Sequence, residues 1–217
     1  MSSTLGQPID TPLECPSCGA GIQVNYRFAK MIVCDYCGQT NYLNPDEKLE
    51  GKGPKQVPLV DYGSKLSKTA HGKIEGREFR VLGRMRYEYP EGFWDEWLLK
   101  LTDDPDTPHW LQEDEGEFTL LRFEKDQKVT QSYEQFRVGE TYEVGDGLSV
   151  FVTEANSAKV TGSEGQIPFY IEPNEQVYFV DGIKKGFRLS MEFIPGDDTE
   201  LYMGQPVSIH DIEITGK

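Results

Sequence analysis

The stretch of this chain that decides its fold runs from Phe79 to Leu101 and reads FRVLGRMRYEYPEGFWDEWLLKL. Apolar and charged residues alternate along its first half, a period of two that is typical of a half-buried β-strand. A turn signal follows at residues 90–92, and a second run of apolar residues returns to Leu101. The stretch therefore predicts an antiparallel hairpin.

The length of the turn sets the register of this hairpin. With a three-residue loop at 90–92, Arg86 faces Glu96 on a polar face and Met85 faces Trp97 on an apolar face. Trp94 then shares the polar face with Glu96, so we expect Trp94 to be an exposed contact residue.

The rest of the chain beyond this hairpin also has the pattern of short strands separated by turns rich in Gly, Pro, Asp and Asn. Strands are expected at 108–113, 117–123, 148–154, 158–161, 167–171, 177–181, 187–194, 200–203 and 207–215. A single helical turn fits near 132–136. The fold class is therefore all-β, with a body that is an antiparallel β-sandwich or barrel-like.

All four cysteines lie in two Cys-x-x-Cys pairs near the N-terminus, namely Cys15 with Cys18 and Cys34 with Cys37. Each pair is followed by a glycine, which tolerates the tight turn that directs backbone N–H groups towards sulfur. Four thiolates at this spacing are the ligand set of a closed, structural zinc site. The segment resembles a zinc ribbon, which implies a fold and not an activity.

Two other interpretations of the cysteines were weighed. A pair of disulfides needs an oxidising compartment, but residues 1–10 lack the basic and apolar regions of a secretory signal. A thioredoxin-like motif needs a Cys-x-x-Cys pair that opens a helix, whereas residues 22–26 alternate like a strand. We therefore expect a zinc ribbon at residues 12–44, a flexible linker at 45–60 and an acidic all-β domain at 61–217. A chelator would then unfold the mobile ribbon alone.

The formal net charge of the chain is −15, and residues 91–217 hold 27 Asp or Glu against ten Lys or Arg. Such a surface repels the phosphate backbone on which nucleic-acid affinity depends. We therefore expect no nucleic-acid binding and favour a ribbon that docks a partner protein. No apolar run approaches the ~20 residues of a transmembrane segment, and the reduced cysteines predict a cytoplasmic location. The oligomeric state is left open.

A candidate binding patch surrounds the tryptophans, which all lie between residues 94 and 110. Aromatic faces pack against partners or hold cationic groups, and neighbouring carboxylates supply charge. The alternative is a hairpin core with a solvated acidic rim. The residues of the patch are Trp94, Glu96, Trp97, Trp110 and Glu113.

Evidence for catalysis is sparse. The three histidines lie in unrelated segments, and the chain contains neither a nucleophile elbow nor a phosphate-binding loop. The alternative function is an enzyme that uses carboxylates in the mouth of a β-barrel. A deep pocket with convergent acids of perturbed pKa would favour that enzyme, and a flat exposed Trp–Glu surface would favour a binding protein.

Three segments resemble a known bacterial family. These are RMRYEYPEGFWDEW at 84–97, HWLQEDEGEF at 109–118, and GQIP at 165–168 preceded by Glu154 and Ala158. Over residues 60–205 the chain is similar to the domain-of-unknown-function family DUF4178, some members of which carry an N-terminal zinc ribbon. The family has no established activity or catalytic residues to carry over to this chain. The resemblance implies an accessory protein encoded beside membrane-stress proteins and polyamine-synthase-like enzymes, with an assembly partner in the cytoplasm or at the inner face of a membrane. Together with the sparse evidence for catalysis, this favours a non-enzymatic binding or scaffold role.

Overall fold

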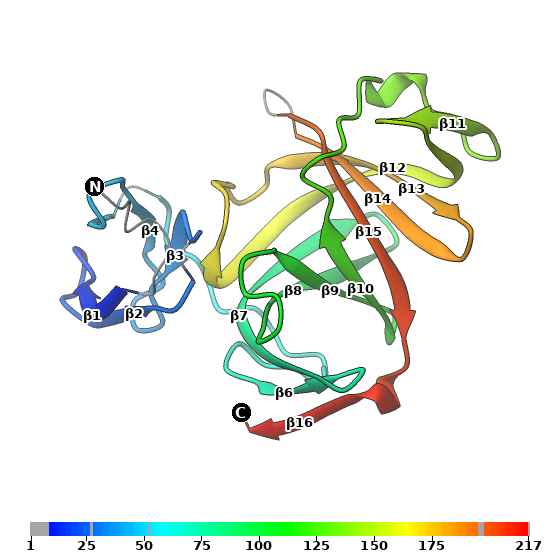
Figure 1. Ribbon diagram of the computed structural model, residues 1–217. Coiled ribbons are helices and arrows are strands. Elements are labelled where there is room, and N and C mark those ends of the chain that lie inside the picture. Colours follow the sequence, from blue (N-terminus) through cyan, green and yellow to red (C-terminus); the bar gives the residue numbers. More distant parts are fainter. Residues whose placement is uncertain (1–8, 27, 52, 195–197, 217) are drawn as a thin grey trace, which may run out of the picture.

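Strands make up almost all the regular structure of the computed structural model, which describes residues 9–26, 28–51, 53–194 and 198–216 (Figure 1). The fold class is all-β, as the sequence predicts. In this part of the chain the helical elements are two short 3-10 turns, η1 (Tyr133–Gln135) and η2 (Ile209–Asp211), and there is no helix long and apolar enough to cross a membrane. The strands are β1 (Ile9–Glu14), β2 (Gly21–Val24), β3 (Met31–Val33), β4 (Thr40–Leu43), β5 (Leu49–Glu50), β6 (His71–Ile74), β7 (Arg77–Tyr89), β8 (Gly92–Leu101), β9 (His109–Asp114), β10 (Glu117–Phe123), β11 (Thr141–Val144), β12 (Leu148–Ile167), β13 (Gln176–Lys184), β14 (Phe187–Phe193), β15 (Glu200–Val207) and β16 (Ile212–Gly216).

Eight antiparallel strands close into a barrel. Their order is β7-β8-β9-β10-β15-β14-β13-β12, and β12 pairs again with β7. A barrel of eight strands has an interior that side chains can fill or that can hold one small ligand. Of the two bodies that the sequence allows, the structure therefore has the barrel. The interior of this barrel is called the lumen below.

The longest strand, β12, makes this closure possible. It continues beyond its ladder with β13, and this second part of the strand pairs with β7. The ladder with β7 shifts between Val160 and Gly162, and Gly165 has a φ of +72°. A Cβ atom on Gly165 would lie 2.3 Å from the carbonyl oxygen of Leu82, so a side chain there would clash. The turn expected between the strands at 158–161 and 167–171 is therefore a bend within one continuous strand, where β12 pairs with β7.

The register expected for the β7–β8 hairpin is wrong by one residue. The turn consists of residues 90–91, so Arg86 pairs with Asp95 and Met85 pairs with Glu96. Because side chains alternate between the two faces of a strand, a slip of one residue moves each residue of β8 to the opposite face. Glu96 therefore shares a face with Met85 inside the barrel.

The outer face of β8 is buried as well. Residues 66–74 and β16 cover it, and the resulting apolar cluster includes Leu66, Ala70, Ile74, Phe79, Trp97, Leu99, Leu101 and Ile212. Burial on both faces explains why the alternation of apolar and polar residues along β8 did not reveal which face is inside.

The ribbon is joined to the barrel by a shared ladder. In β3, Met31 pairs with Ile167 and Ile32 with Gln166, at the end of β12. The Gln166 side-chain oxygen also accepts hydrogen bonds of 2.9 Å from the backbone N–H groups of Asn25 and Tyr26. Figure 1 shows the blue N-terminal strands beside the yellow end of β12. The expectation that the ribbon moves relative to the barrel is therefore wrong.

Residues 45–60, expected to be a flexible linker, pack against both parts. Within them β5 pairs with β4, the Gln56 N–H donates to the carbonyl of Gly38 at 2.7 Å, and the Leu59 N–H donates to the Glu164 carboxylate at 3.2 Å. The segment therefore extends the ribbon sheet and returns to β12. The three domain boundaries given above stay predictions.

Candidate functional site

The two Cys-x-x-Cys segments fold into matching turns. The Gly19 N–H donates to the carbonyl of Cys15 at 2.8 Å, and the Gly38 N–H donates to the carbonyl of Cys34 at 2.9 Å. Both glycines have positive φ, +75° and +71°, a region that side chains with a Cβ seldom adopt. The glycine after each pair is therefore needed for the turn, as the sequence predicts.

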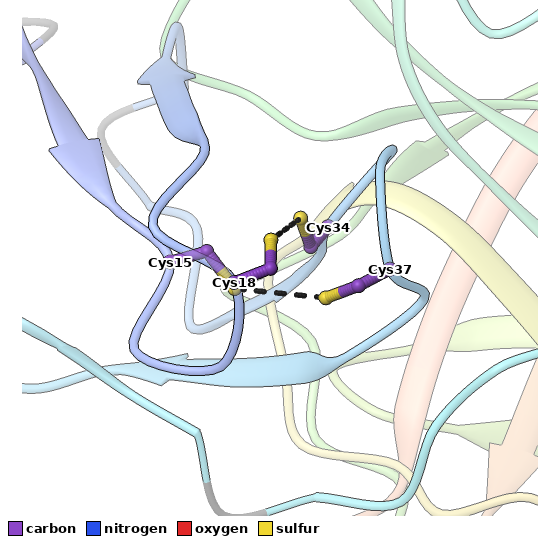
Figure 2. A group of neighbouring side chains, drawn as sticks. All are labelled: Cys15, Cys18, Cys34 and Cys37. Atoms are coloured by element: carbon purple, nitrogen blue, oxygen red, sulfur yellow. Dashed lines mark hydrogen bonds between the residues drawn. The ribbon is translucent and has the colours of Figure 1, made fainter.

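These turns bring the four sulfur atoms together (Figure 2). The Sγ atoms of Cys15 and Cys37 are 3.8 Å apart, as are those of Cys18 and Cys34, and all four lie within 4.8 Å of one another. A tetrahedral site with metal–sulfur bonds of about 2.3 Å requires sulfur–sulfur distances of about 3.8 Å, whereas a disulfide requires about 2.0 Å. The four thiols could therefore hold a metal ion.

The surroundings of the cluster fix its position. Cys15 and Cys34 are buried, and Asn41, which is also buried, places its Oδ1 3.9 Å from the Cys15 sulfur. The Asn41 Nδ2 donates to the carbonyl of Gln39 at 2.8 Å. Such outer contacts orient metal ligands.

The predicted tryptophan patch is not one surface. All three tryptophans are buried, and Trp94, expected to be exposed, is only 7% exposed. That expectation is wrong because the register slip turns Trp94 into the lumen, where it stacks on Tyr87 with ring centroids 4.8 Å apart. Its Nε1 donates to the Glu96 carboxylate at 3.0 Å.

The other members of the patch lie elsewhere. On the outer face of the barrel, the Glu113 carboxylate accepts hydrogen bonds from Trp97 Nε1 at 2.9 Å and from Ser64 Oγ at 2.6 Å. Trp110 lines a groove between the ribbon and the barrel. The five residues are thus divided among three places, and their role in binding stays a prediction.

Sequence reasoning missed the charged group that the outer face of the hairpin buries. Arg84, Arg86 and Asp95 are each at most 4% exposed. The Arg86 guanidinium donates to both Asp95 oxygens at 2.8 Å, and Arg84 donates to Asp95 Oδ2 at 2.6 Å. The expected register makes Arg86 face Glu96, and the register in the structure gives it Asp95 instead.

The groove is a second feature that the sequence did not reveal. It has a volume of about 930 Å³ and lies between the ribbon and one end of the barrel. Its aromatic residues come from both parts, namely Tyr26, Phe28, Trp110, Phe123, Phe169, Tyr170 and Tyr202. Phe28 is 39% exposed and Tyr170 is 53% exposed, so the groove presents aromatic faces to solvent.

The lumen holds acidic groups that form no ion pair within the described residues. Burial raises the pKa of the Glu96 carboxyl from 4.5 to about 7; the hydrogen bond from Trp94 opposes this rise, and the Asp181 and Glu200 carboxylates add to it. Burial likewise raises the pKa of Asp181 to about 6, and the Arg188 guanidinium opposes that rise. The titratable groups around this site are Tyr87, Asp114, Glu154, Asp181, Arg188, Glu192, Glu200 and Tyr202.

The substitution Glu96→Gln is expected to stabilise the protein above pH 7. Below about pH 4.5 the carboxyl is protonated in the folded and the unfolded chain; as the pH rises to about 7, ionisation favours the unfolded chain. A shift from 4.5 to about 7 corresponds to a gain of at most about 3 kcal/mol. Urea unfolding at pH 5 and pH 8 measures it. The exposed variant Glu213→Gln is the control, and equal stabilities of Glu96→Gln and the parent at pH 8 would contradict the expectation.

Comparison with known proteins gives one match. Residues 70–209 match the family described as Domain of unknown function (DUF4178). The chain belongs to the DUF4178 family. The DUF4178 match covers the barrel from β6 to η2, so the cysteine cluster lies outside it. No curated protein and no solved structure matches the chain.

Proposed function

We propose that this DUF4178 protein is a non-enzymatic binding protein that docks a partner protein in the groove between its ribbon and its barrel. The observation that carries the proposal is the groove itself, whose aromatic residues come from both parts of the chain. Aromatic side chains are enriched at protein interfaces. The buried Trp110 also lines the groove, and its Nε1 has no hydrogen-bond partner among the described residues, so a partner that offers an acceptor there would satisfy it.

The metal in this proposal is one structural zinc ion. Tetrahedral sites of four sulfurs suit zinc and iron, and two Cys-x-x-Cys turns are the usual ligands of structural zinc. Four protein ligands leave no position for a reacting water, which supports a structural role. The zinc would hold β2 and β3 in place, and these strands flank the ribbon side of the groove.

The reduced cysteines support a cytoplasmic location. On the family association alone, we place the partner in a membrane-stress or polyamine-related system. The proposal includes no nucleic-acid binding, because the net charge of −15 opposes it.

Affinity capture from the native host tests the docking proposal when it compares three full-length proteins. The wild type is expected to retain a specific protein, and Phe28→Ser is expected to lose it. Phe151→Ser is the matched control, since Phe151 is 42% exposed and lies outside the groove. The purified partner should then bind the wild type at least 10-fold more tightly than Phe28→Ser. Equal binding of the partner to both would contradict docking in the groove.

One observation favours the second candidate, an enzyme. Glu96, Asp181 and Glu192 converge in the lumen, and burial raises the pKa of each. Convergent acids of raised pKa are typical of acid–base catalysis. The space between them is about 80 Å³, which restricts any substrate group that enters it to a very small one.

A further inference from the structure

The inside of the barrel contains a cavity that the groove does not reach. It has a volume of about 80 Å³, and its walls come from β7, β8, β9, β12, β13 and β14. Since one water molecule takes up about 30 Å³ in the liquid, the cavity accommodates a group of about three non-hydrogen atoms. A ligand bound in the cavity must therefore be small, or it must be a longer molecule of which only one end lies in the cavity.

The lining of this cavity is acidic. Five carboxylates line it, and no Lys, Arg or His does; the carboxylates are Glu96, Asp114, Glu154, Asp181 and Glu192. Among the residues that the structure describes, none of the five forms an ion pair. A buried carboxyl group is stable either protonated or beside a positive charge, so a cation in the cavity is the partner that would let these carboxyls ionise.

Two polar side chains point to the same missing partner. Glu192 is 8% exposed, and its carboxyl group forms no hydrogen bond or ion pair with the described residues. Tyr87 is 1% exposed, and its hydroxyl has no hydrogen-bond partner of ordinary geometry, although it lies close enough to Glu96 to lower the pKa of that carboxyl. Both side chains line the cavity. Unsatisfied polar groups at this depth are rare and costly.

Aromatic rings complete the walls. Tyr87 stacks on Trp94, and Phe179 meets Trp94 edge to face with centroids 5.2 Å apart. Rings of this kind attract cations through their faces and contact alkyl groups. The cavity therefore combines negative charge with apolar surface.

The arrangement of the carboxylates argues against a metal ion. Calcium and magnesium require several oxygen ligands at about 2.0 to 2.6 Å from the ion. Within the described residues, the four cysteines form the one group of three or more His, Cys, Asp or Glu side chains that could hold a metal ion. The carboxylates of the cavity do not form such a group, so a cation there would have to use separate hydrogen bonds.

We propose that the lumen binds the primary ammonium group of a small organic amine. The three N–H donors of the ammonium would bind the Glu96 and Glu192 carboxylates and the Tyr87 oxygen, and its short alkyl chain would lie against Trp94 and Phe179. Glu154 is exposed and Asp114 is partly exposed, so carboxylates continue from the floor of the cavity to its rim. The rim attracts cations from solvent.

Isothermal titration of ethylammonium into the full-length, metal-loaded protein at pH 8 tests the proposal. Ethylammonium is expected to bind at least 10-fold more tightly than ethanol, which has the same size and no charge. It is also expected to bind more tightly than tetramethylammonium, which has no N–H donor. The Trp94 indole signal should shift on binding in a nuclear magnetic resonance spectrum.

Glu192→Gln is expected to weaken ethylammonium binding at least 10-fold, and Glu213→Gln, at an exposed position of β16 outside the cavity, should leave it unchanged. Circular dichroism establishes that each variant is folded. If Glu192→Gln fails to fold, Glu96→Gln, for which we expect increased stability, takes its place. No binding of ethylammonium, equal binding by the folded variants, or a preference for calcium over ethylammonium would overturn the proposal.

Discussion

Replacing Asp95 with asparagine is expected to lower the free energy of unfolding by about 3 to 5 kcal/mol. Asp95 is 3% exposed and accepts hydrogen bonds from both Arg84 and Arg86, which are buried beside it. Asparagine keeps the shape of the side chain and removes its charge. The Arg86 guanidinium would then stay buried without the carboxylate that neutralises it, and Arg84 would keep only Glu164, 3.9 Å away, so this loss is costlier than that of an exposed pair.

The chain offers a matched control for this variant. Asp103 also forms hydrogen bonds with an arginine, Arg77, at 2.8 and 3.0 Å, but its side chain is 57% exposed. Asp103→Asn is therefore expected to cost less than about 1 kcal/mol. Urea unfolding of both variants at pH 7 makes the comparison. Equal losses for Asp95→Asn and Asp103→Asn would show that the buried cluster is not held by its charge pairing.

The parts of the fold that the sequence predicts well depend on interactions between residues that are close together in the chain. The hairpin of β9 and β10 is an example, since its turn at residues 115–116 places Glu115 and Gly116 at positive φ. The strand expected at 117–123 has the bounds of β10. The two cysteine turns are equally local, because each depends on a single glycine.

The register of the β7–β8 hairpin could not be predicted from the same kind of pattern. A turn of two residues and a turn of three both fit the segment at 90–92, and both faces of β8 are buried. The pattern of apolar and polar residues therefore could not show which of the two adjacent acids, Asp95 or Glu96, faces the inside of the barrel. In the structure one of these adjacent acids pairs with two arginines, and the other faces a cavity without a cation.

Barrel closure and ribbon attachment depend on contacts between distant segments. In the ladder that closes the barrel, Glu88 pairs with Lys159, and in the ladder that attaches the ribbon, Ile32 pairs with Gln166. The sequence around one residue of such a pair contains no pattern that indicates which distant residue is its partner. For the same reason, the groove and the lumen could not be predicted, because each is lined by residues from strands that are far apart in sequence.

Loss of the metal is expected to destabilise the ribbon and the adjoining part of the barrel together. The sequence alone predicts that a chelator unfolds residues 12–44 and leaves the barrel intact. The structure changes that expectation, because β3 pairs with β12, and Cys15 and Cys34 share an apolar cluster with Met85, Tyr87 and Ile167. Binding of zinc by small sites of this kind is worth about 10 to 16 kcal/mol, so its loss is larger than any substitution considered above.

Cys34→Ser provides the genetic form of metal removal, and Ser17→Ala, in the other cysteine turn, is the control that keeps all four ligands. Elemental analysis of the wild type should find one zinc per chain, and Cys34→Ser should lose it. A purified protein that carries iron would replace zinc in the proposal.

Amide hydrogen exchange with and without a chelator tests most directly whether the metal holds ribbon and barrel together. The Lys30 N–H donates to the Ile167 carbonyl at 2.9 Å, and β3 pairs with Gln166 and Ile167, so protection of the amides at this end of β12 reports on the attachment. On metal removal, we predict faster exchange both in residues 12–44 and in the end of β12 around Gln166. Faster exchange confined to residues 12–44, with the end of β12 still protected, would contradict the account.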